Sequence, residues 1–68
     1  MNEQSMNMQI RKFLKKVGVT SQREIETALR KAADSGALRA GGEVPLSMTL
    51  HIDSLGVSLV IKDTLEVE

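Results

Sequence analysis

The only histidine of the chain, His51, is the side chain best suited to acid–base chemistry. Residues two apart lie on the same face of a strand, so Asp53 could orient His51 as a general base. No serine or cysteine nucleophile completes such a site, because the nearby serines fit ordinary strand or turn positions. We therefore expect an exposed strand histidine, predict no catalytic residue, and do not expect the protein to be an enzyme.

The residues that could hold a metal or a phosphate are also too few or wrongly spaced. Zinc sites need several histidine or cysteine ligands, and the sequence has one histidine and no cysteine. The C-terminal acids Asp63, Glu66 and Glu68 lack the loop spacing of a calcium site. No glycine run is followed by the Gly-Lys-Ser/Thr of a phosphate loop. The sequence predicts no metal and no cofactor.

Five basic residues form the candidate interaction surface: Arg11, Lys12, Lys15, Lys16 and Arg23. The first four make two rows at a spacing of four on a helix, where like charges repel weakly. Three interpretations stay open. The residues could form a solvated helix face, or a surface for the phosphate backbone of a nucleic acid. Alternatively, the basic part of one copy could meet the acidic part of another.

Composition weighs against the nucleic-acid interpretation. The formal net charge is zero, and Phe13 is the only aromatic residue, so bases have almost nothing to stack on. A helix-turn-helix with Gly18 in its turn fits poorly, because Leu14, Glu24 and Thr27 stand where that motif needs small or apolar residues. Nucleic-acid binding therefore stays the alternative function, behind protein interaction.

The elements that position these residues begin with two predicted helices, over about residues 6–17 and 21–35. Gly18 fits the left-handed residue that follows a helix, and Ser21 with Glu24 fits a capping box. Gly36 would end the second helix. Apolar residues at helical spacing support both segments: Met6, Ile10, Phe13, Leu14 and Val17, then Ile25, Ala28, Leu29, Ala32 and Ala33. We expect the two helices to pack as an antiparallel helical hairpin.

We expect a mobile connector over residues 37–45. After it, apolar and polar residues alternate with a period of two, which predicts strands over about 46–53 and 57–67. Asp53 and Gly56 suit the turn between them. Asp63 interrupts the apolar face of the second strand, so we expect a bulge or bend there, and residues 64–68 could form a short third strand. The predicted fold class is α+β, with the helical hairpin on one face of an antiparallel β-hairpin (ααββ).

Length and charge bear on how the chain is completed. From the length of 68 residues we expect a single domain, 1–68, with a small core. Residues 1–31 carry seven basic and three acidic residues, and residues 32–68 carry two and six, so the halves have formal charges of +4 and −4. No apolar run is long enough to span a membrane, no secretory signal is visible, and cysteine is absent. These features predict a cytoplasmic protein with no membrane partner.

Self-association is the expected way to complete so small a core. Small domains usually need disulfides, a metal or oligomerisation. The first two are not available here, which leaves good helix–sheet packing or oligomerisation. A two-stranded sheet also leaves both edges unpaired. We predict a homodimer that pairs strand edges across a two-fold axis. A different protein partner is the other possibility.

The segment from Ile10 to Glu26, IRKFLKKVGVTSQREIE, is the most distinctive part of the sequence. Together with Met1-Asn2-Glu3 and Met48-Thr49-Leu50, it resembles a family of small bacterial proteins classed as a domain of unknown function. The resemblance covers nearly the whole chain. It implies a bacterial, cytoplasmic, stand-alone protein without an assigned activity, and it transfers no functional residue.

Overall fold

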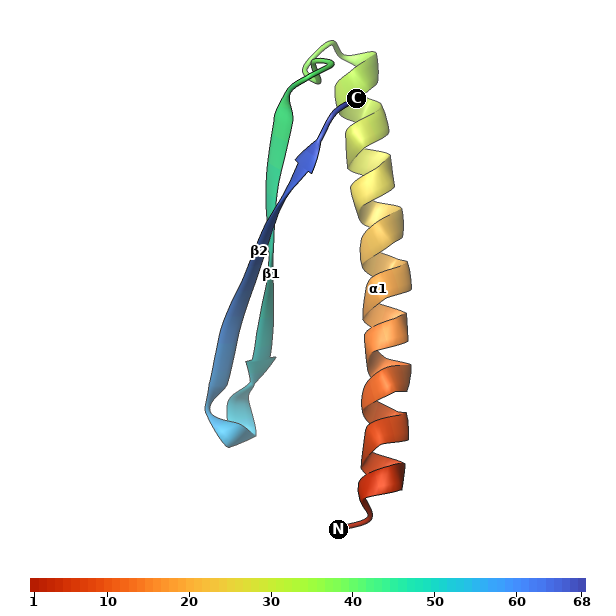
Figure 1. Ribbon diagram of the computed structural model, residues 1–68, viewed down its shortest axis with the longest axis vertical. Coiled ribbons are helices and arrows are strands. Elements are labelled where there is room, and N and C mark those ends of the chain that lie inside the picture. The colour runs from red at the N-terminus through yellow and green to blue at the C-terminus, as the bar shows by residue number, and fades with distance from the viewer. The chain divides into compact units, whose positions relative to one another are not determined.

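The computed structural model describes residues 1–68, which divide into two compact units, Met1–Ala37 and Leu38–Glu68. The first unit holds one helix, α1 (Glu3–Asp34). The second holds strands β1 (Glu43–Ile52) and β2 (Val57–Glu66), joined by a 3-10 turn, η1 (Asp53–Leu55) (Figure 1). The structure therefore confirms the α+β class, with one helix followed by an antiparallel two-stranded sheet.

Helix α1 begins at an asparagine cap. The Asn2 side chain accepts a hydrogen bond from the Ser5 N–H at 3.1 Å, and the Asn2 carbonyl accepts one from the Met6 N–H at 3.0 Å. The cap satisfies backbone donors that have no partner within the helix. Glu3, in the first turn, adds a negative charge where the helix dipole favours one.

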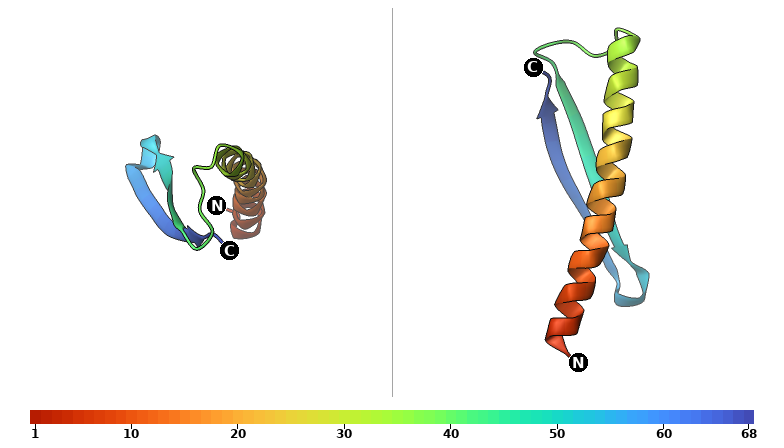
Figure 2. Two further views of the ribbon diagram at one scale, coloured as in Figure 1. Left: turned by 90° about the horizontal axis from the view of Figure 1, so that it is seen from above. Right: turned by 90° about the vertical axis from the view of Figure 1, so that its right-hand side faces the viewer.

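The predicted helical hairpin is wrong, because α1 is one unbroken helix (Figure 2). Its range includes both Gly18 and Ser21. Gly18 does not have a positive φ, and Ser21 lies inside the helix and does not cap a new one. One interior glycine costs a helix only about 1 kcal/mol. Lysine, arginine, glutamine and glutamate on both sides favour helix, and a turn would lose several backbone hydrogen bonds.

The end of α1 was predicted correctly. Gly36 has a φ of 78°, and its N–H donates to the Ala33 carbonyl at 3.2 Å. The Ala37 N–H donates to the Ala32 carbonyl at 2.9 Å. These two bonds form a Schellman motif, in which a glycine takes the left-handed conformation and stops the helix.

The segment predicted as a connector over residues 37–45 is shorter in the structure, because β1 already begins at Glu43. Before it, the Gly42 N–H donates to the Arg39 carbonyl at 3.0 Å, and Gly41 has a φ of 83°. This is a type II turn, which needs a positive φ at its third residue. The turn leads into the sheet, where the Val67 N–H donates to the Gly42 carbonyl at 2.9 Å.

The β-hairpin keeps one regular register from Glu43 opposite Glu66 to Ile52 opposite Val57. Asp63 pairs with Leu46 inside this register, so the predicted bulge or bend is wrong. Strand β2 continues to Glu66 without a break, and the sheet has no third strand. At the turn, the Gly56 N–H donates to the Asp53 carbonyl at 3.2 Å.

Each unit has an apolar side but no buried core. Residues directly opposite each other in an antiparallel pair project to the same face. The even-numbered residues of β1 and their partners therefore form one mostly apolar face, and the odd-numbered residues form a polar one. No residue of the chain is buried. Each unit by itself therefore leaves its apolar side uncovered.

Candidate interaction surfaces

The apolar face of the β-hairpin is the most continuous apolar surface. Its part nearest the turn, here called the distal apolar patch, comprises three cross-strand pairs: Met48–Ile61, Leu50–Leu59 and Ile52–Val57. The pairs contain no charged residue. Met48 is 42% exposed, Leu59 52% and Ile61 56%. Side chains of this kind usually pack in a core, whereas these three residues are about half exposed.

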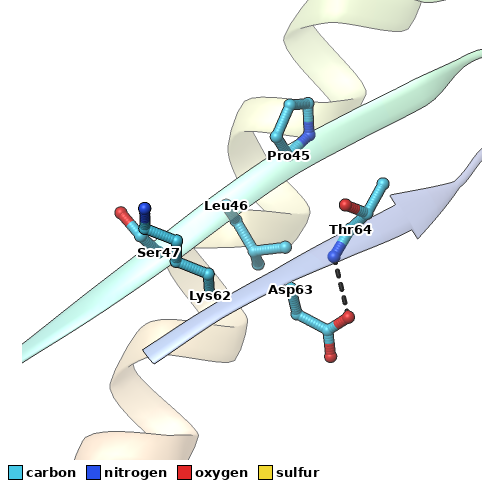
Figure 3. A pocket seen from close by; sticks show the side chains of 6 residues that line it. All are labelled: Pro45, Leu46, Ser47, Lys62, Asp63 and Thr64. Atoms are coloured by element: carbon cyan, nitrogen blue, oxygen red, sulfur yellow. Dashed lines mark hydrogen bonds between the residues drawn. The ribbon is translucent and has the colours of Figure 1, made fainter. Parts of the chain in front are cut away.

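Asp63 bounds this patch on the side away from the turn. Its side chain shares the apolar face with Leu46, and its Oδ1 accepts a hydrogen bond from the N–H of Thr64 at 2.7 Å (Figure 3). An open depression lies here across both strands, lined by Pro45, Leu46, Ser47, Lys62, Asp63 and Thr64. The depression offers one carboxylate and one ammonium group, too few polar groups to define a small-molecule site.

Helix α1 carries an apolar stripe that continues through the predicted break. Val17, Ser21 and Ile25 follow at intervals of four, so the stripe passes through one serine without changing face. Ile10, Phe13 and Leu14 in its N-terminal half are exposed. The helix by itself cannot cover this stripe, because an isolated helix has no second layer.

The structure places all five predicted surface residues on α1 and in contact with solvent. Lys12, Lys16 and Arg23 lie within about 40° of one line along the helix, because a helix turns about 100° per residue. Arg11 and Lys15 form a neighbouring row. None of the five forms an ion pair, since the only salt bridge joins Arg30 and Glu26 at 3.3 Å.

Sequence reasoning did not include Arg30 in this surface. Arg30 follows Lys12 by five helical turns and therefore lies on the same line, which only a continuous helix reveals. Its charge is partly offset by Glu26, which also accepts a hydrogen bond from Gln22 at 3.0 Å. Arg30 therefore extends the row geometrically and adds little positive charge.

His51 lies on the polar face opposite Ser58 and is exposed. It forms neither a hydrogen bond nor an ion pair with Asp53. The reason is local, because Asp53 begins η1 and has left the strand. The structure therefore does not assemble the pair considered as a possible base. No group of three or more histidine, cysteine or acidic side chains is placed to hold a metal ion.

No stretch of α1 is apolar enough to cross a bilayer as a helix.

Among known protein families, the model described as "Family of unknown function (DUF6494)" matches residues 1–68, which is the whole chain. No curated protein and no solved structure matches the chain.

Proposed function

We propose that the chain, which belongs to the family of unknown function DUF6494, is a non-catalytic interaction protein that associates with itself as a homodimer. The observation that carries the proposal is that neither unit by itself buries any residue, while each has an apolar side. A two-stranded hairpin is marginal in water by itself, and so is a single helix. A second copy would supply the missing layer.

The distribution of charge over the two units supports a second copy of the chain as the partner. Unit Met1–Ala37 holds seven basic and four acidic residues, and unit Leu38–Glu68 holds two and five, which gives formal charges of +3 and −3. The whole chain is neutral, so two copies meet without net repulsion. A two-fold axis that sets the units of one copy against the unlike units of the other would pair opposite charges.

The proposal places this assembly in the cytoplasm of a bacterium. A chain without cysteine suits a reducing compartment, and the bacterial source rests on the sequence resemblance described above. The same surfaces could receive a different protein, so the first experiment must separate a second copy from other partners.

Size-exclusion chromatography with light scattering tests the proposal directly. We expect a mass near twice 7.4 kDa at high concentration, which falls towards that of one chain on dilution. Concentration must be read by refractive index, because the chain has neither tryptophan nor tyrosine. A monomer at every concentration, with cooperative thermal unfolding, would contradict self-association.

Nucleic-acid binding is the second candidate, and one observation favours it. The continuous helix aligns Lys12, Lys16 and Arg23 and leaves them without ion pairs. Phosphate contacts made by such a row would weaken steeply with salt. Labelled duplex and single-stranded DNA or RNA should therefore be titrated at low and moderate salt. Lys12→Gln with Lys16→Gln should weaken any binding, whereas the matched hairpin variant Lys62→Gln should not. The absence of binding at low salt would end this alternative.

A further inference from the structure

Whether another strand can pair with the β-hairpin depends on the backbone N–H and C=O groups that point outward from its two edges. In an antiparallel pair, hydrogen-bonded and non-hydrogen-bonded residue pairs alternate. The Val67 N–H donates to the Gly42 carbonyl, which makes that pair hydrogen-bonded. Counted along the register from there, the pairs of the polar face are the non-hydrogen-bonded ones, and their backbone N–H groups point to the free edges.

Both free edges lose a donor at the same cross-strand pair, Pro45 opposite Thr64. Pro45 on β1 has no N–H. The N–H of Thr64 on β2 is taken by Oδ1 of Asp63 at 2.7 Å. A strand that approached either edge would therefore find one of its carbonyls without a partner, which costs free energy once water is excluded. The bond also gives Asp63 a role that its place on an apolar face does not otherwise explain.

Natural sheets discourage edge pairing by these means, namely proline, an inward-pointing charged residue and lysine on an edge strand. The hairpin has all three, in Pro45, Asp63 and Lys62. Lys62 lies on β2 two residues before Thr64, the partner of Pro45. The outward N–H groups of Ser47, Thr49 and His51 on β1 form only a short remaining row. Neither edge offers the uninterrupted ladder that a four-stranded sheet across a two-fold axis would need.

We propose that the second copy binds the apolar face of the hairpin, at the distal apolar patch, and that the strand edges stay unpaired in the dimer. This inference rests on the proposed self-association. The patch contains no charge that would have to be desolvated, and the neutral chain with its two oppositely charged units suits a second copy as the occupant.

The patch also sets the strength of this contact. It extends for about 14 Å along the strands, at about 3.4 Å per residue. A stable interface usually buries about 800 Å² on each partner, which is more than such a patch provides. The dimer is therefore expected to dissociate on dilution.

Amide hydrogen exchange on the dimeric protein separates the two geometries without any substitution. We expect fast exchange for the outward amides of Ser47, Thr49, Val60 and Lys62. The ladder amides of Leu50 and Leu59 should be protected. Protection of the outward amides at dimer concentrations, lost on dilution, would show that the copies pair through their edges and would overturn the inference.

Two lysine substitutions on neighbouring residues of β1 provide the matched test. Met48→Lys places a charge in the patch and should raise the dimer dissociation constant ~10-fold or more, which is about 1.4 kcal/mol. Thr49→Lys adds the same charge to the polar face and should leave it nearly unchanged. Met48→Gln serves if Met48→Lys loses its far-ultraviolet circular dichroism. A dimer sensitive to Thr49→Lys and insensitive to both Met48 variants would contradict face binding. A wild-type monomer would instead refute self-association itself.

Discussion

Gly18 and Gly36 show how the surroundings of a residue decide its role. Gly36 follows Asp34 and Ser35, which are poor helix formers, and it takes the positive φ that stops α1. Gly18 lies between lysine-rich and glutamate-rich turns and remains helical. The end at Gly36 was predictable from residue types alone. The continuation through Gly18 was not, because it depends on the summed preference of many neighbours against the cost of one glycine.

Replacement of each glycine by alanine should have opposite effects. A Cβ at Gly18 would meet no atom within 4 Å, so Gly18→Ala should stabilise the protein by roughly 0.5–1 kcal/mol. Gly36→Ala should destabilise it by about 1–2 kcal/mol, because alanine resists a φ of 78°. Urea unfolding followed by circular dichroism at one fixed protein concentration measures both. If Gly18→Ala destabilised the protein, it would indicate a turn at Gly18 or a partner packed closely against it.

At the scale of elements, the hairpin was more predictable than the helix. The alternation of apolar and polar residues indicated both strands and their apolar face, and the register confirms it. Asp63 misled the prediction, because a charge on an apolar face suggests an interruption. A thin, exposed sheet tolerates that charge in place, since its carboxylate binds the neighbouring Thr64 N–H. Only the three-dimensional ladder shows that this N–H lies on an edge.

The sequence predicts two helices in place of α1 because Gly18 fits the residue that follows a helix, and Ser21 with Glu24 fits a capping box. Part of the candidate surface does not depend on this difference, because Lys12, Lys16 and Arg23 lie on one face of the single helix α1. Because α1 is continuous, the row of basic residues extends to Arg30. Periodicity alone could not decide the matter, because a stripe that passes through one serine fits either one helix or two.

At the scale of the whole molecule, the charge split is the property that two copies could exploit together. If unlike units face each other in the dimer, salt should weaken it, because surface charges are screened over about 8–10 Å at physiological ionic strength. We expect the dissociation constant to rise several-fold from low to high sodium chloride. An interface that depends on apolar contact alone would show little change or become tighter.

Charge-neutralising variants distinguish unit-to-unit attraction from a simple effect of net charge. Lys15→Gln with Lys16→Gln lowers the helix unit from +3 to +1, and Glu66→Gln with Glu68→Gln changes the hairpin unit from −3 to −1. Combined, the four substitutions restore a neutral chain. If unlike units attract across the dimer, the combined variant should dimerise most weakly at low salt and match the wild type at high salt. If net charge were the cause, the combined variant would recover wild-type dimerisation, because its two copies no longer repel each other. Light scattering of the four proteins at two salt concentrations measures the difference.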